Sequence, residues 1–242
     1  AAEQLASARE SLREAETAVL RSERLAAIGQ LSAGLAHELR NPLGTIRASA
    51  EMLKRNVAAE NAVAGELAGF ITSEVDRTNS LVSRFLEFAR PLEIRPQMTD
   101  LTEVIDRAVE RLKTHDAGAR VSVHKAYLPD IPAFPLDAEL MERVMFNLLV
   151  NAAEASPPEG AVTVKTRAVD GSVEISVIDR GAGIDPVNRE SVFNPFFTTK
   201  QHGVGLGLAI VSKIVDEHGG KMTVESELGK GSVFRIYLPF AR

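Results

Sequence analysis

The sequence comprises 242 residues, 45% of them hydrophobic, which is enough for one large or two ordinary domains with a sizeable core. Its net charge of −5 with dispersed basic residues excludes a nucleic-acid-binding surface, and the absence of cysteine excludes disulfides, a thiolate nucleophile and a cysteine-based zinc site. No apolar run approaches the roughly 18 residues of a membrane span and there is no signal peptide, so we expect no membrane contact by this fragment.

The first 27 residues are rich in Ala, Glu, Arg and Leu and predict one helix. Leu5, Leu12, Val19 and Ala26 repeat every seven residues, which favours a short parallel coiled coil over residues 1–27. A solvated amphipathic helix is the alternative. No Gly-Pro break separates this segment from the next helix, so a shift of the coiled coil would be transmitted to that helix. The chain starts without methionine, which indicates a fragment of a longer protein.

The next helix carries a histidine outside its apolar stripe. The stripe repeats at three- and four-residue steps and comprises Ile28, Leu31, Leu35, Leu39, Leu43, Ile46, Ala50 and Leu53. His37 lies two residues from Leu35 and from Leu39, about 200° around the helix, so it points away from the packed face. Glu38 is its neighbour, and Pro42 predicts a bend five residues later. Taken alone, these residues also fit a solvated surface histidine.

A second apolar stripe follows a turn at residues 54–64 and ends at Pro91; it includes Leu67, Ile71, Thr78, Leu81, Phe85 and Phe88. Two antiparallel helices cannot bury both of their apolar faces alone, but two such hairpins form a four-helix bundle. The sequence therefore predicts a homodimer through residues 28–90. Residues 93–99 read as an interdomain linker.

From residue 100 onward, helices alternate with strands. Asp100 and Glu103 form a capping-box-like start to one helix, and two further helices are expected from Asp137 to about Ala155 and over Leu206–His218. The expected strands are Val121–His124, Val162–Arg167, Val173–Ile178, Lys221–Ser226 and Ser232–Leu238. This order predicts an α+β fold, a helical hairpin followed by a mixed sheet with helices on one face.

Two asparagines stand out on the helix expected from Asp137. Asn147 and Asn151 are four residues apart, so both amides leave one face of the helix. Neutral amide oxygens suit Mg²⁺ when phosphates supply the negative charge. Polar surface decoration is the alternative, but the surrounding residues are apolar, and unpaired amides would be costly in a buried helix.

Three loops later in the chain add further candidates. Asp179 ends a strand and begins Asp-Arg-Gly-Ala-Gly, a turn whose carboxylate can accept a bond from an exocyclic amino group, although a bare structural turn has the same pattern. Residues 193–200 carry three phenylalanines, which either anchor the loop in the core or form the hinge of a mobile lid. Gly203, Gly205 and Gly207 open a helix and predict an anion site, with neither Walker nor Rossmann spacing.

In this order, the His-Glu-Leu-Arg-Asn-Pro-Leu box and the four downstream features resemble the H, N, G1, F and G2 boxes of bacterial two-component sensor histidine kinases of the nitrogen-regulator class. The resemblance covers residues 22–242. It implies a dimerisation and phosphoacceptor hairpin over residues 28–92 and a gyrase-like ATP-binding α/β sandwich over residues 100–242. It also implies the cytoplasmic part of a longer sensor, with or without a membrane anchor.

The resemblance further implies a protein histidine kinase. ATP would phosphorylate His37, and the phosphoryl group would pass to an aspartate of a response regulator. Glu38 would orient the imidazole and accept its proton, while Asn41, one turn beyond His37, matches an amide implicated in dephosphorylating the regulator. The family pattern assigns Mg²⁺ to Asn147 and Asn151, adenine contacts to Asp179, Gly181 and Gly183, and lid or phosphate contacts to Phe196, Thr199, Lys200, Gly203, Gly205, Leu206 and Gly207.

Two positions depart from the family pattern. Val204 stands where many relatives have Thr, and Glu154 stands where other subclasses have Lys. Two alternative functions fit parts of the chain: a coiled-coil dimer that binds ATP only to change shape, and a gyrase- or chaperone-type ATPase. The second leaves residues 28–54 without an explanation.

Overall fold

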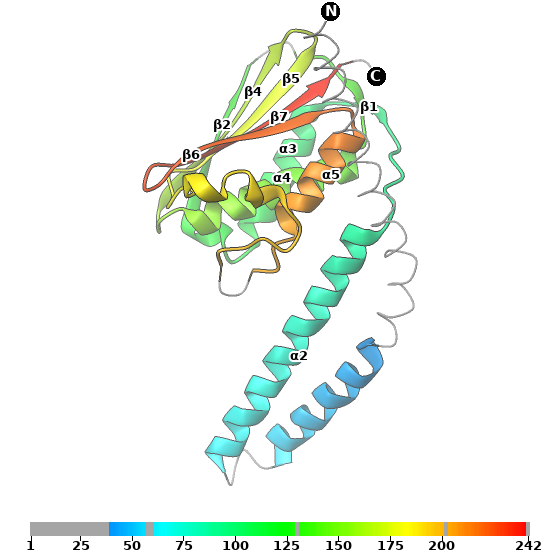
Figure 1. The fold of residues 1–242 in the computed structure, drawn as a ribbon, viewed down its shortest axis with the longest axis vertical. Coiled ribbons are helices and arrows are strands. Elements are labelled where there is room, and N and C mark those ends of the chain that lie inside the picture. The colour runs from blue at the N-terminus through cyan, green and yellow to red at the C-terminus, as the bar shows by residue number, and fades with distance from the viewer. Residues whose placement is uncertain (1–38, 57–60, 129–130, 201–202, 241–242) are drawn as a thin grey trace, which may run out of the picture. The chain divides into compact units, whose positions relative to one another are not determined.

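The structure is a computed structural model that describes residues 39–56, 61–128, 131–200 and 203–240 (Figure 1). The predicted coiled coil, His37 and Glu38 lie outside the described residues. The chain divides into two compact units, one ending at Pro91 and the other beginning at Leu92. Each unit is described by itself.

The first unit is a helical hairpin. Its first described helix covers residues 39–56, and its second, α2, runs from Ala62 to Ala89. The Asn61 side chain caps α2 by accepting a hydrogen bond from the Ala64 amide at 3.1 Å. The helix ends where the chain approaches Pro91, because Arg90 adopts the extended backbone that a residue before proline prefers. Pro42 lies in the first described turn of this helix, and the residues before Leu39, which a test of the predicted bend requires, lie outside the described residues.

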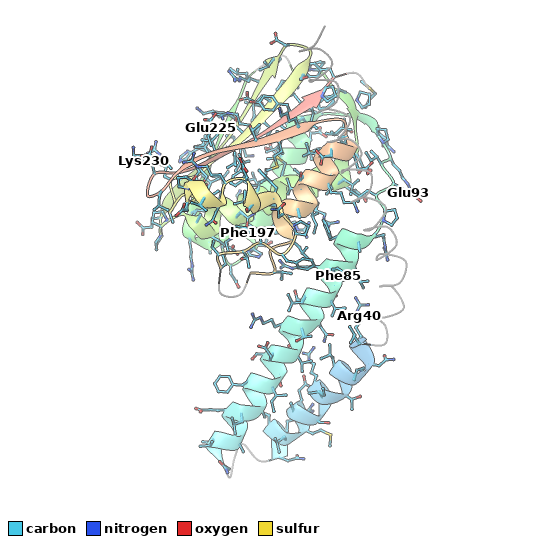
Figure 2. The ribbon with its side chains drawn as sticks, in the orientation of Figure 1. Arg40, Phe85, Glu93, Phe197, Glu225 and Lys230 are labelled. Atoms are coloured by element: carbon cyan, nitrogen blue, oxygen red, sulfur yellow. The ribbon has the colours of Figure 1, made fainter. Side chains whose placement is uncertain are left out.

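Polar contacts join the two helices of the hairpin. Arg40, which is labelled in Figure 2, donates from Nη2 to Ser83 Oγ at 3.1 Å. Arg47 Nη1 lies 3.0 Å from an Asp76 carboxylate oxygen. The buried positions in this unit include Ala50, Ala68 and Val75. Larger apolar side chains are 42–67% exposed: Leu39, Ile46, Met52, Leu53, Val63, Leu67, Phe70 and Ile71. The described part of the hairpin therefore buries mainly small residues, with Phe88 as a large exception, and leaves much of its predicted stripes uncovered in the single chain.

The second unit is a mixed sheet with helices on one face (Figure 1). Five strands pair in the order β2-β4-β5-β7-β6, and within this sheet only the β2–β4 pair is parallel. The strands are β2 (Val121–Tyr127), β4 (Gly160–Val169), β5 (Ser172–Ile178), β6 (Lys221–Glu227) and β7 (Gly231–Pro239). The helices are α3 (Leu101–Lys113), α4 (Ala138–Ala155) and α5 (Gly207–Glu217), with short 3₁₀ turns η1 (Gly118–Arg120), η2 (Pro186–Asn188) and η3 (Ser191–Phe193).

The core lies between the helices and one face of the sheet. Alternate residues of each strand point inward, as in β7, where Phe234, Ile236 and Leu238 are buried. The other face is polar; there Glu174, itself buried, accepts a hydrogen bond from Arg167 at 2.6 Å. The predicted fold class, a helical hairpin followed by a mixed sheet with helices on one face, is confirmed.

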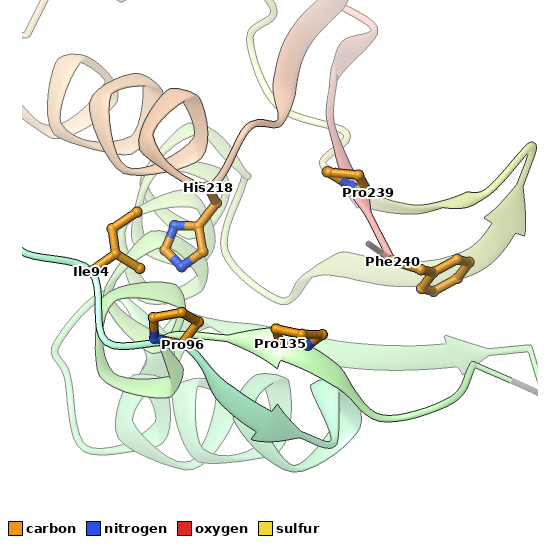
Figure 3. A pocket seen from close by; sticks show the side chains of 6 residues that line it. All are labelled: Ile94, Pro96, Pro135, His218, Pro239 and Phe240. Atoms are coloured by element: carbon orange, nitrogen blue, oxygen red, sulfur yellow. The ribbon is translucent and has the colours of Figure 1, made fainter. Parts of the chain in front are cut away.

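A small two-stranded ribbon lies where the sequence predicts a linker and a proline-rich turn. Strand β1 (Gln97–Thr99) pairs antiparallel with β3 (Phe134–Leu136). Arg95 then reaches α4, donating from its backbone amide to Asp137 Oδ2 at 2.9 Å. The Asp137 amide donates in turn to His218 Nε2 at 3.2 Å. His218 also lines a small cavity, whose other lining residues are Ile94, Pro96, Pro135, Pro239 and Phe240 (Figure 3). The entry to this unit is thus bonded to Asp137, the N-cap of α4, which is bonded in turn to His218 at the C-terminal end of α5.

Candidate functional site

Helix α4 positions the two asparagines. Asp137 caps it by accepting from the Leu140 amide at 3.1 Å, and a buried stripe fixes its rotation against the sheet. Asn147 and Asn151 are half-buried at the side that faces α5. A methyl group on Gly207 would lie 3.8 Å from Asn147 Oδ1 and 4.0 Å from Asn151 Nδ2. Asn147 donates from Nδ2 to the Arg143 carbonyl at 3.1 Å, so its amide orientation leaves the oxygen as the acceptor.

The start of α5 provides backbone donors next to these amides. Leu206 is its N-cap residue and makes no side-chain capping bond, so the first amides of α5 keep their hydrogen-bonding capacity. Those amides and the helix dipole favour an anion. Leu206 itself is buried, so its side chain anchors the turn and only its backbone can face a ligand.

Gly205 lets the preceding aromatic segment pack against this turn. Its φ is +69°, and a Cβ there would lie 2.5 Å from the Phe196 carbonyl carbon and 2.6 Å from the Phe197 oxygen. The Phe196 amide donates to the Gly205 oxygen at 2.9 Å, while the Phe196 side chain is exposed. A Cβ on Gly203 would likewise collide with Thr198 Oγ1. The glycines therefore serve loop packing as well as helix initiation.

Asp179 is buried at the other end of the site. Its Oδ1 accepts from the Gly181 amide at 2.8 Å and from the Ser232 amide at 3.2 Å. Burial raises the pKa of the Asp179 carboxyl above its usual range, although the hydrogen bonds from Gly181 and Ser232 act in the opposite direction. A carboxylate held in this way can act as a directed acceptor.

The loop after Asp179 is clamped between α4 and the β6–β7 hairpin. A Cβ on Gly181 would lie 2.1 Å from the Ala155 oxygen, and a Cβ on Gly183, whose φ is +70°, would lie 2.1 Å from the Glu227 oxygen. The Ile184 amide donates to Ser226 Oγ at 2.8 Å. Ser226 and Ser232 support the site but were not among the predicted residues, because no local pattern marks a contact made across more than 40 positions.

Lys200 contributes a positive charge beside Asn151. Its ammonium donates to Asn151 Oδ1 at 3.1 Å and forms an ion pair with the Glu154 carboxylate. Its backbone amide donates to Thr198 Oγ1 at 3.1 Å. Thr199 is exposed. Glu154, which the sequence marks only as a departure from the family pattern, therefore also belongs to the site.

The predicted site residues thus form two groups within the second unit. Asn147 and Asn151 lie beside Gly207 at the start of α5, and Lys200 joins this group by bonding Asn151. Asp179 and Gly181 form the second group near the C-terminal end of α4, with Gly183 against the end of β6. Asn147 and Ala155 are separated by about 12 Å at 1.5 Å per helical residue. This spacing suits a ligand with an anionic group at one end and a hydrogen-bond donor at the other. Asn41 is exposed in the first unit.

The side chains of the candidate site determine which metal ion it could bind. Among the described residues, no group of three or more His, Cys, Asp or Glu side chains could hold one. A cation at Asn147 and Asn151 would therefore depend on amide oxygens together with a ligand's phosphates, which is a combination that Mg²⁺ accepts. No helix in the described ranges is long and apolar enough to cross a membrane.

Both units match known domain families. Residues 27–94 match the His Kinase A (phospho-acceptor) domain. Residues 136–242 match the histidine kinase-, DNA gyrase B-, and HSP90-like ATPase. The second unit is therefore an ATP-binding domain of this type.

Named relatives are sensor kinases. The sensor histidine kinase ZraS of Klebsiella oxytoca is 38% identical over 230 residues, which are 95% of this chain and 50% of ZraS. The chain spans about half the length of such curated relatives. Full-length ShkA in complex with AMPPNP has a TM-score of 0.70 at 29% identity, covering 88% of this chain and 46% of ShkA.

Two further solved structures resemble this chain over different shares of its length. ThkA in complex with the response regulator TrrA has a TM-score of 0.67 at 28% identity, covering 95% of this chain and 67% of that chain. The mycobacterial sensor histidine kinase MprB has a TM-score of 0.54 at 35% identity, covering 61% of this chain and 97% of that chain. Since a phosphoacceptor domain precedes the ATPase domain and a relative at this identity is covered almost end to end, the chain belongs to the two-component sensor histidine kinases.

Proposed function

We propose that this protein transfers the terminal phosphoryl group of ATP to His37 and then to an aspartate of a response regulator. The observation that carries the proposal is that Asn147 and Asn151 lie beside the uncapped start of α5, with the Lys200 ammonium bonded to Asn151. This is a phosphate site, and it belongs to a chain whose other unit matches a phosphoacceptor domain. The solved ThkA–TrrA complex supports a response regulator as the partner.

The residues divide the work as follows. Asp179 accepts a bond from the exocyclic amino group of adenine, and the loop through Gly183 brings backbone close to the ring. The first amides of α5 and the Lys200 ammonium bind the phosphates. Mg²⁺, when bound, would be held by Asn147 and Asn151 and would neutralise charge on those phosphates.

At the acceptor, the neutral imidazole of His37 is the nucleophile, with Glu38 orienting the ring and taking its proton as positive charge develops. Residues 28–92 form the phosphoacceptor hairpin, residues 93–99 the linker and residues 100–242 the ATP-binding domain, preceded by a signalling coiled coil over residues 1–27. The exposed apolar residues of the hairpin support a homodimer through residues 28–90, arranged as a four-helix bundle.

The test is acid-labile labelling. We expect the full chain, given Mg²⁺ and γ-labelled ATP, to acquire phosphate that is stable in base and lost in acid. His37→Gln should abolish this label and leave nucleotide affinity unchanged. A label that persists in His37→Gln would exclude His37 as the acceptor, and an unlabelled wild-type chain that binds ATP would favour the ATP-dependent scaffold.

We propose a second activity, dephosphorylation of the regulator, on the basis of Asn41. Asn41 is four residues after His37, and its side chain is exposed, so the amide can reach a partner. Asn41→Ala should slow regulator dephosphorylation more than autophosphorylation. Equal losses in the two assays would remove the distinct role.

A further inference from the structure

A lysine ammonium occupies the metal end of the candidate site. Lys200 Nζ lies 3.1 Å from Asn151 Oδ1 and is paired with the Glu154 carboxylate. Asn151 and Glu154 are three residues apart on α4, so their side chains are neighbours on one helical face. Two oxygens from a single rigid helix therefore converge on one positive charge, and one of them is an oxygen that the proposed function gives to Mg²⁺.

This contact cannot persist unchanged when a metal-bearing phosphate arrives. A divalent cation and an ammonium on the same amide oxygen would repel each other at short range. The backbone of Lys200 is bonded to Thr198 Oγ1, so movement of the flexible four-carbon side chain is the simplest way for the ammonium to leave. Its new partner would be the phosphates, which carry the opposite charge.

We propose that Glu154 is a specificity-determining residue of the nucleotide site, whose carboxylate retains Lys200 on Asn151 until a triphosphate and its metal replace the contact. This inference rests on the proposed function. The ion pair opposes the binding of ligands whose phosphates reach the start of α5. It does not oppose adenosine, which extends only over the Asp179 end.

Two features distinguish this ion pair from an ordinary surface pair. Pairs such as Lys113–Glu110 and Lys230–Glu227 join residues three apart in one local segment. The Lys200–Glu154 pair joins positions 46 residues apart and includes a third partner in the site, Asn151. Both side chains are nevertheless 40–45% exposed, so the expected effect on affinity is modest.

The first measurement maps lysine reactivity in the full, nucleotide-free chain by acylation and mass spectrometry. An ammonium held between two oxygens is shielded from the reagent, so Glu154→Gln should raise the acylation rate of Lys200 severalfold. Lys113 and Lys230 serve as internal references and should not change. An unchanged Lys200 rate in Glu154→Gln would overturn the inference.

The second measurement compares ligands. Glu154→Gln should tighten the binding of Mg·AMPPNP about two- to fivefold, the range expected for removal of one half-exposed ion pair, and leave adenosine binding unchanged. The matched control is Glu110→Gln, which removes a similar carboxylate on α3 and should affect neither ligand. Equal tightening for both ligands, or none for Mg·AMPPNP, would overturn the inference.

The two proposals fail in different ways. A wild-type chain that binds Mg·AMPPNP and forms acid-labile phosphate, while Glu154→Gln changes neither readout, refutes the role of Glu154 alone. A wild-type chain that binds no nucleotide refutes the proposed function and, with it, this inference. The melting temperature of Glu154→Gln should match that of the wild type, because the position is exposed.

Discussion

The two units of this chain satisfy their apolar residues by different means. The second unit buries large side chains such as Leu148, Leu149 and Ile236 between its helices and its sheet. The described part of the hairpin buries small ones such as Ala50 and Ala68, together with Phe88, and exposes many of its large ones. One unit therefore covers its apolar residues within a single chain, whereas the exposed apolar residues of the other support the proposed homodimer.

The largest expected effect follows from placing a charge on the exposed face of the hairpin. Ile71→Asp should weaken the dimer about 100-fold or more, because an unpaired carboxylate in an apolar interface costs several kcal/mol and about 1.4 kcal/mol corresponds to a factor of ten. Sedimentation of the full chain at micromolar concentrations measures this. The control is Val187→Asp, a substitution at a residue that is 85% exposed in η2 of the second unit. Loss of dimer in both variants, or in neither, would break the comparison between the units.

The sequence predicted the long helices and strands of both units but not the short strands. The three- and four-residue stripes predicted the hairpin helices, and the alternation of Val173, Ile175 and Val177 indicates β5, because each of these elements is long enough to show its period. The β1–β3 ribbon was not predicted. Its strands are three residues long, and Pro135 within β3 reads as a turn signal although an edge strand tolerates it.

The candidate site shows the same limit. The motif residues Asn147, Asn151 and Asp179 lie in elements whose type the sequence predicts, and the structure shows Gly207 beside the two asparagines. Residues that support the site through long-range contacts were not predicted. The Glu154–Lys200 pair and the Ser232–Asp179 bond join distant positions, so neither leaves a local pattern.

An intermediate effect is expected from replacing a glycine with alanine, which should change the free energy of unfolding in opposite directions in the two units. Gly183→Ala should destabilise the second unit by about 1–3 kcal/mol, because its φ is +70° and the new methyl group would collide with the Glu227 carbonyl. Gly44→Ala, in an exposed part of the hairpin helix with no atom near the new methyl group, should stabilise that helix by about 0.5–1 kcal/mol.

Denaturant unfolding of the full chain, followed by a probe in each unit, measures both glycine variants. The chain contains no cysteine, so a single introduced thiol can carry the probe without background labelling. A stabilising Gly183→Ala would show that the loop after Asp179 is not held against the β6–β7 hairpin. A destabilising Gly44→Ala would indicate that the dimer partner covers this position.

The smallest effect concerns Asp179 and its dependence on pH. Burial raises the pKa of this carboxyl in the folded protein above its value in the unfolded chain. The ionised form therefore costs stability at neutral pH, and that cost disappears as the pH falls through the folded-state pKa and the group is protonated. Asp179→Asn keeps an oxygen for the Gly181 and Ser232 amides, so it should slightly stabilise the second unit at pH 7, with a difference that shrinks in acid.

The same substitution should weaken adenosine and Mg·AMPPNP alike, because it places an amide donor or a weaker acceptor opposite the exocyclic amino group of adenine. Thermal unfolding at several pH values and titration with both ligands measure the two effects. A variant that loses stability at pH 7 would show that the carboxylate supports the fold itself. A variant that gains stability and loses both ligands shows that this unit, although complete without a partner, keeps a buried charge at the expense of its own stability in order to bind nucleotide.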